Sequence, residues 1–321
     1  MLRTVRLPYR ALIAAVATLP LLAGCGPLKR MAINSVASSL AKTGTSATSD
    51  NDPELIEAAF PYQIKLQEGL LDIVPHNRDL LVSTCSLSVE FGYAFYQGKA
   101  DILGDAHRDE VIELHQKALD MYLRGRKYCL RALDQRFKNV SGDLVKDQAT
   151  MERAVKRFNN KKKDVEMLYW TAASWGAAIA LAKDKPEIAI DFPSVRAIAD
   201  RALALDESWN KGAIHELMIT LDSLPAMLGG SPERAKKHFD RAVELQHGLS
   251  PGPYVAYALG IDTQDPQNKE DFVAKMKLAL AIDPDQDPDT RLVTILTQRR
   301  AKALLEQIDT IFPSAAAAHQ Q

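Results

Sequence analysis

The stretches RALALD at residues 201–206, RAVEL at 241–245 and LALAIDP at 278–284 share a pattern of alanines and branched apolar residues at the end of a helical segment. Two related stretches precede them, GLLD at 69–72 and RALD at 131–134. Their equivalent positions recur 62, 70, 40 and 37 residues apart. These positions are Leu71, Leu133, Leu203, Val243 and Leu280.

Two of these spacings are close to one period, and two to twice the period, of the tetratricopeptide repeat, which is about 34 residues long. Fragments of that repeat's pattern are present, such as Ala235 with Phe239 and the pair Leu259-Gly260, but no copy is complete. Sustained period-two alternation, which is typical of strands, is absent. The sequence therefore predicts an all-α fold, a degenerate tetratricopeptide-like helical solenoid, with an irregular helical bundle as the alternative.

Helix boundaries are marked locally. Asp52-Pro53-Glu54 and Ser231-Pro232-Glu233 each place an N-cap residue, a proline and an acid at a helix start. A final helix from Asp289 to Phe312 carries an apolar stripe, and we expect it to cap the exposed end of the solenoid.

The first 24 residues have the form of an export signal. Arg3, Arg6 and Arg10 precede an uncharged apolar run at 11–23, which is too short to span a bilayer as a mature helix. We therefore expect four parts: a lipoprotein signal peptide (1–24), a lipid-anchored tether (25–50), a helical-repeat domain (51–313) and a disordered tail (314–321).

The tetrad Leu22-Ala23-Gly24-Cys25 is similar to a bacterial lipobox, which predicts that Cys25 carries the lipid. Acyl chains would hold an otherwise soluble domain on a membrane. Gly26 follows the cysteine where an aspartate would favour inner-membrane retention, so we expect the periplasmic face of the outer membrane.

Charge and motifs exclude several functions. Forty basic residues balance 41 acidic ones, which argues against nucleic-acid binding. His215-Glu216 begins like a zinc-protease motif, but Ile219 occupies the position of the second histidine. No phosphate-binding or nucleophile motif is present, so we expect no enzyme, no metal and no cofactor. Export would permit a disulfide between Cys85 and Cys129, but their apolar helical surroundings favour two separate buried side chains.

Aromatic residues cluster on segments that would be the first helices of the repeat pairs. Tyr93 and Tyr96 lie in one cluster, and Trp170 and Trp175 in another. We expect these four to form part of a groove for an apolar ligand or partner chain, although packing between helices is the alternative. Residues 170 and 175 point about 140° apart on a helix, so at least one tryptophan, most naturally Trp175, belongs to the core.

Several stretches, in order along the chain, resemble the TRAP transporter T-component (TatT) family. They are LAGC (22–25), SDNDPEL (49–55), LYWTAASWGAAIA (168–180), GAIHE (212–216), GGSPERA (229–235), GPYV (252–255) and QRRA (298–301).

This resemblance implies a lipid-anchored periplasmic accessory protein of a tripartite ATP-independent periplasmic transporter. Such a protein works beside the periplasmic solute-binding protein, can bind a hydrophobic small molecule in a cleft, and can form a homotrimer with a central pore. The alternative is a structural envelope lipoprotein that scaffolds other proteins through its repeats. Neighbouring genes for a solute receptor and TRAP membrane subunits would favour the first.

Overall fold

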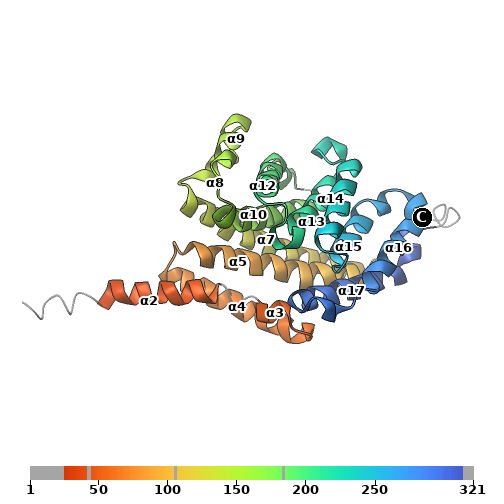
Figure 1. Ribbon diagram of the computed structural model, residues 1–321, viewed down its shortest axis with the longest axis horizontal. Coiled ribbons are helices and arrows are strands. Elements are labelled where there is room, and N and C mark those ends of the chain that lie inside the picture. The colour runs from red at the N-terminus through yellow and green to blue at the C-terminus, as the bar shows by residue number, and fades with distance from the viewer. Residues whose placement is uncertain (1–24, 42–44, 105–106, 183–184, 314–321) are drawn as a thin grey trace, which may run out of the picture.

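The computed structural model describes residues 25–41, 45–104, 107–182 and 185–313, and every regular element in these ranges is helical (Figure 1). The all-α prediction is thus confirmed for the described residues. The first half comprises α2 (Cys25–Leu40), α3 (Thr45–Thr48), α4 (Pro53–Ile73), α5 (Arg78–Phe91), the π-helix η1 (Gly92–Gln97), α6 (Gly98–Leu103), α7 (Arg108–Arg136), α8 (Val140–Asp143), α9 (Gln148–Lys156) and α10 (Lys161–Leu181). The second half comprises α11 (Pro186–Ala189), α12 (Phe192–Leu205), α13 (Ala213–Asp222), α14 (Pro232–Leu245), α15 (Gly252–Gly260), α16 (Lys269–Leu280), α17 (Arg291–Glu306) and α18 (Ile308–Ile311).

The predicted helix starts are confirmed at α4 and α14. The Asp52 carboxylate accepts a hydrogen bond from the backbone N–H of Leu55 at 3.0 Å, and Pro53 is the first helical residue. The Ser231 hydroxyl accepts one from the N–H of Arg234 at 3.3 Å, again just before a proline. Each cap satisfies a backbone donor that the helix itself leaves unpaired.

Successive long helices pack against one another through the body, with α5 on α7, α7 on α10, α10 on α12, α13 on α14 and α15 on α16. The chain does not end at the far side of this array, because α17 returns to contact α6, α4 and α3 (Figure 1). Leu292 of α17 joins the buried cluster that contains Ile56 and Phe60 of α4.

Polar contacts reinforce this closure. Arg299 of α17 pairs with Glu54 of α4 at 2.5 Å, and Gln307 donates to the backbone carbonyl of Asp101 at 3.1 Å. We expected the last helix to cap a free solenoid end; instead it packs on α15 and α16 and also on the first helices. The two ends of the helical array therefore meet, and a regular tetratricopeptide solenoid remains a prediction.

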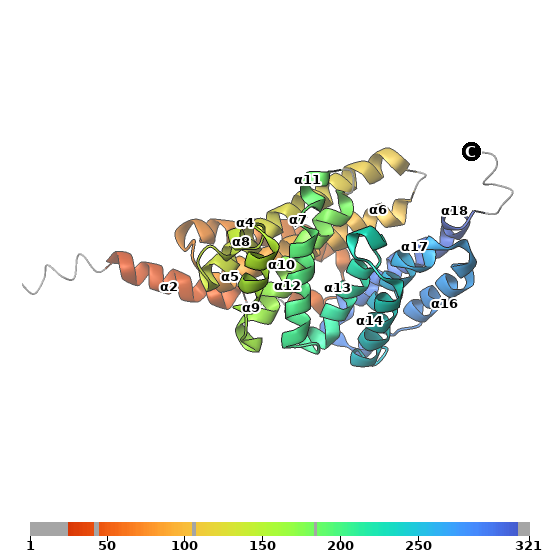
Figure 2. The same ribbon diagram turned by 90° about the horizontal axis from the view of Figure 1, so that it is seen from above.

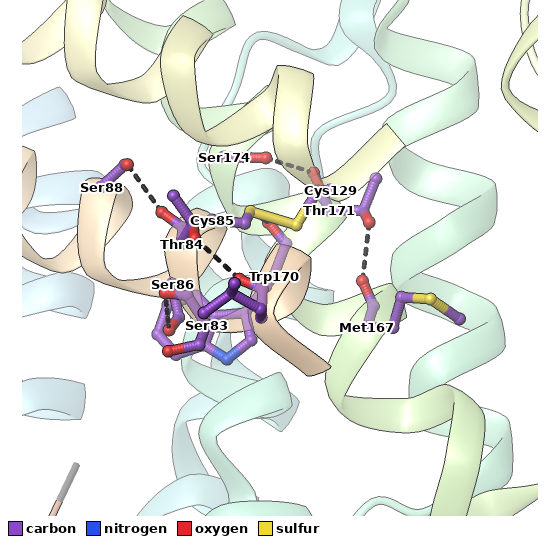
Figure 3. Close-up of a disulfide and its surroundings, with 11 residues drawn as sticks. Ser83, Thr84, Cys85, Ser86, Ser88, Cys129, Met167, Trp170, Thr171 and Ser174 are labelled. Atoms are coloured by element: carbon purple, nitrogen blue, oxygen red, sulfur yellow. Dashed lines mark hydrogen bonds between the residues drawn. A yellow bond between two sulfur atoms is a disulfide. The ribbon is translucent and has the colours of Figure 1, made fainter. Parts of the chain in front are cut away.

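The largest core cluster surrounds a covalent link that corrects one expectation. Cys85 of α5 and Cys129 of α7, expected as two separate buried side chains, form a disulfide with a Cα–Cα distance of 5.5 Å (Figure 3). Gly125 lies one turn before Cys129, and a Cβ there would lie 3.1 Å from the Cys85 carbonyl oxygen. The glycine thus permits the close approach of α5 and α7. The spacing of the two cysteines in the sequence does not show that their helices meet, so it could not predict the disulfide.

The region predicted as a tether begins with a 16-residue helix, α2. Its second half is fixed to the body: Ala37 is fully buried, and the Asn77 amide donates to the Asn34 side chain at 2.9 Å and to Ser38 at 3.1 Å. Its first half extends away from the body in both views (Figures 1 and 2). The predicted signal peptide (1–24) and tail (314–321) lie outside the described residues.

Candidate binding surface

Tyr93 and Tyr96, two of the predicted groove residues, lie in the π-helix η1. In this segment the N–H of Gly98 donates a hydrogen bond to the carbonyl of Tyr93, five residues earlier. Tyr93 is 45% exposed, and its hydroxyl accepts a hydrogen bond from Arg300 of α17 at 2.8 Å. Tyr96 is half-buried and packs edge-on against Phe91, with ring centroids 5.0 Å apart. π-helical segments often occur at functional sites, and here the segment presents one accessible tyrosine.

Trp170 and Trp175 lie in different environments on α10. Trp170 is half-buried and contacts Tyr169, which in turn contacts Trp209; the ring centroids are 4.9 and 4.7 Å apart. Trp175 is fully buried, with the Arg126 guanidinium 4.1 Å from its ring centroid. The structure thus places Trp175 in the core and not on a groove, which fits the expected divergence of the two tryptophans.

Two glutamates lie close enough to these aromatic residues to affect Tyr169. Glu90 of α5 and Glu216 of α13 are only partly exposed, and burial raises the pKa of each carboxyl from 4.5 to about 7. Burial raises the pKa of Tyr169 as well, and the nearby Glu216, Glu90 and Tyr93 raise it further. Desolvation of the charged form is thus the main cause of all three raised pKa values, although each of these side chains keeps some contact with water. We call this set the acidic–aromatic surface: Glu90, Tyr93, Tyr169, Trp170 and Glu216.

Glu216 is held in place from the following helices. Gln246 hydrogen-bonds to its carboxyl, and a Cβ at Gly252 would collide with its carboxylate oxygens. The Arg300 charge lowers the pKa of Glu216, but burial outweighs this effect. Sequence reasoning singled out His215-Glu216 only as an incomplete metal motif. The desolvation of Glu216 depends on three other helices, which no local pattern reveals.

Arg300 connects the last helix to this surface. It is 9% exposed and pairs with Asp101 of α6 at 2.5 Å, while its guanidinium carbon lies 5.4 Å from the centroid of the Tyr93 ring. Burial raises the pKa of Asp101 despite the opposing charge of Arg300. The closure of the helical array thus also fixes the orientation of Tyr93.

His215 and His238 form a separate pair between α13 and α14. Their Nδ1 atoms lie 2.8 Å apart, and His215 Nε2 faces a Glu207 carboxylate oxygen at 3.3 Å. Burial lowers the pKa of both rings, that of His238 to about 4. Two neutral rings can share one hydrogen bond, so the contact is structural. Within the described ranges, no group of three His, Cys, Asp or Glu residues could hold a metal ion.

These features describe a helical body with a cluster of partly exposed aromatic and acidic side chains on its surface. A family model, TRAP transporter T-component, matches residues 49–312, and the chain belongs to this family. It is also 26% identical over 314 residues to an uncharacterized protein of Treponema pallidum (strain Nichols), covering 93% of this chain and 96% of that protein. Among the described helices, none has both the length and the apolar character needed to cross a membrane.

Family membership gives the chain an accessory role in TRAP transport, in association with other TRAP subunits at the bacterial cell envelope.

Proposed function

We propose that this protein is a lipid-anchored periplasmic subunit that docks the solute-binding protein of a TRAP transporter. Cys25 is the acylated residue in this proposal, and the outer membrane is the site of attachment. The family match supports the transporter role. The tetrad that ends at Cys25 supports the anchor, since the charged residues before it, the length of the apolar run and the small residues next to the cysteine all agree with a lipoprotein signal.

The acidic–aromatic surface is the proposed ligand site, and the observation that carries this assignment is the contact of partly exposed aromatic rings at Tyr169 and Trp170, near the exposed Tyr93. Tyr93, Trp170 and the adjacent Tyr96 offer large, rigid apolar areas at a small cost in conformational entropy. In this proposal the surface binds a hydrophobic small molecule or an extended segment of the receptor. Trp175 takes no part, because its side chain has no exposed surface.

The test uses the mature chain with Cys25→Ser, which is soluble by design, as bait for the purified solute receptor of a TRAP system from the same bacterium. We expect the receptor to be retained. Trp170→Ala should lower the affinity about tenfold or more, as truncation of a central aromatic does in other interfaces. Tyr62→Ala is the control, since Tyr62 is equally aromatic but 73% exposed on α4.

Equal retention of a receptor by the parent chain and by both variants would support docking but would show that the acidic–aromatic surface takes no part in it. No retention of any TRAP receptor, with the fold intact by circular dichroism, would favour the structural envelope lipoprotein. Solvent extraction and mass spectrometry of the purified chain would then show whether an apolar solute is bound at all.

A further inference from the structure

One face of α4 is apolar and uncovered. The inward face buries Ile56, Phe60, Ile64 and Leu71. The outward face exposes four large apolar side chains: Leu55 (57% exposed), Tyr62 (73%), Leu66 (41%) and Ile73 (44%). At about 100° per residue these four lie within an arc of about 40° and extend over about 27 Å of helix. We call this set the α4 stripe: Leu55, Tyr62, Leu66 and Ile73.

No other described segment covers the stripe. Gly69 lies on the same face, and a Cβ built there meets nothing within 4 Å. A surface helix of a globular protein ordinarily presents polar side chains on its outer face. Three of the four acidic residues of α4 form ion pairs: Glu54 with Arg299, Glu57 with Lys99 at 2.5 Å and Glu68 with Lys65 at 2.6 Å. Asp72, the fourth, is exposed but lies about 100° around the helix from the centre of the stripe, so no acidic residue of α4 lies on the stripe itself.

The helix that begins at Cys25 lies next to α4. Ala37 of α2 belongs to the buried cluster that also contains Leu71 and Val74, and the side-chain amide of Asn77 donates a hydrogen bond to the Asn34 side chain of α2. Figure 1 shows α2 and α4 along the same edge of the molecule, the lower one in that view. A lipid on Cys25 is thus joined to this edge through a docked helix and not through a free linker, and the bilayer is held near α4.

We propose that the α4 stripe rests in the headgroup region of the bilayer that receives the Cys25 lipid. The occupant is a lipid surface, and this inference rests on the lipid anchor of the proposed function. A single stripe on one helix, with a tyrosine at its centre, suits the interface between headgroups and acyl chains. Lys29 and Arg30, close to the anchor in sequence, suit an anionic leaflet.

This arrangement gives the molecule a defined orientation. The edge formed by α2 and α4 faces the membrane, whereas α13 and α14 lie on the opposite side of the body (Figure 1). Met227, which is 90% exposed just before α14, then points into the periplasm. The lipid anchor alone would allow the protein to take any tilt relative to the membrane, whereas contact through the α4 stripe allows one.

The experiment places an environment-sensitive dye on the mature lipoprotein in vesicles of phosphatidylethanolamine and phosphatidylglycerol. Cys85 and Cys129 are bonded and Cys25 is acylated, so an added cysteine is the single free thiol. Ala59→Cys labels the stripe's face without removing a stripe residue, and Met227→Cys is the matched control. Mass spectrometry of each sample reports acylation separately.

We expect a blue-shifted emission at position 59, quenched at least twofold by lipids that carry a doxyl group, and no quenching at position 227. Adding Tyr62→Ser and Leu66→Ser should abolish the quenching at 59, whereas Ile112→Ser, an exposed apolar residue of α7, should not. A melting curve for each variant checks the fold.

Equal, weak quenching at 59 and 227 in acylated protein would overturn the membrane contact while leaving the anchor intact. Absence of acylation would instead refute the anchor, and this inference with it. If the label at 59 is already shielded in the acyl-free Cys25→Ser chain in solution, and light scattering gives a multiple of the monomer mass, a second copy covers the stripe and the proposal is wrong.

Discussion

The two tryptophans of α10 show how much one position on a helix can decide. Trp170 and Trp175 share a helix and a side-chain type, but only Trp170 keeps contact with solvent. The five-residue spacing predicted this divergence, since residues five apart lie on different faces. Which of the two faces inward depends on where α7 and α12 pack, and the small residues after Trp175 were the only local indication.

The first prediction concerns these tryptophans. Trp175→Ala removes a fully buried ring, so the free energy of unfolding should fall by about 3–5 kcal/mol. Trp170→Ala removes a half-buried ring and should cost less, about 1–2 kcal/mol. Urea denaturation of both variants measures the difference. Equal losses would mean that Trp170 also serves packing alone.

The two glutamates of the acidic–aromatic surface could not be predicted from the sequence as members of one cluster. Glu90 and Glu216 are 126 positions apart, and neither stands in a complete motif. Their raised pKa values follow from desolvation by helices that meet only in the folded chain. In contrast, Cys25 depends on a short local pattern, which is why the sequence alone could single it out.

The second prediction concerns the Glu216 carboxyl and the way in which it makes the stability of the fold depend on pH. Its pKa is about 7 in the folded state and near 4.5 when unfolded, so the folded state binds the proton more tightly. The desolvation cost is therefore full above pH 7 and disappears as the pH falls towards 4.5. Glu216→Gln should raise the melting temperature at pH 8, and the gain should shrink at pH 5.

Glu152→Gln, on the exposed side of α9, serves as the control for this measurement and should change little at either pH. A gain from Glu216→Gln that is the same at pH 8 and pH 5 would show that packing of the amide, and not removal of a buried charge, is responsible.

At the scale of elements, the sequence predicted those helix boundaries that depend on neighbouring residues in the chain. The caps at Asp52 and Ser231 depend on the next three residues, and both were found as expected. The π-helix η1 was not predicted, because it depends on packing against α7, which is a tertiary contact. A Cβ at Gly92, the first residue of η1, would lie 3.0 Å from the Cβ of Met121 in α7, so the glycine permits this close approach. The disulfide was missed for the same reason, since the pairing of α5 with α7 is a tertiary contact.

The third prediction measures what that disulfide contributes. It joins two helices across a sequence separation of 44 residues. In the chain-entropy account, a loop of that size restricts the unfolded state enough to stabilise the fold by about 4 kcal/mol. The double variant Cys85→Ser/Cys129→Ser should lose about that amount in urea denaturation. Adding a reductant should destabilise the parent chain but leave the double variant unchanged.

At the scale of the whole molecule, the decisive feature is the contact between the two ends of the helical array. The repeat pattern indicated successive helices, but it carries no information on where the last one goes. Arg299 and Glu54 pair across 245 positions, and Arg300 reaches Asp101 and Tyr93 beside them. Closure thereby links the stability of α17 to the orientation of Tyr93 in the acidic–aromatic surface, two properties that would be independent in an open array.

The last prediction separates closure from ordinary surface pairing with two adjacent arginines. Arg299→Ala removes an exposed ion pair and should cost about 0–1 kcal/mol. Arg300→Ala leaves Asp101 without its partner and frees Tyr93; it should cost about 2–3 kcal/mol, less than for fully buried pairs because Asp101 keeps some solvent contact. Hydrogen exchange in the Arg300 variant should rise in α6 and η1 as well as in α17, because these elements open together. If exchange rises in α17 alone, the contact between the two ends of the array does not stabilise α6 and η1, and closure does not hold Tyr93 in place.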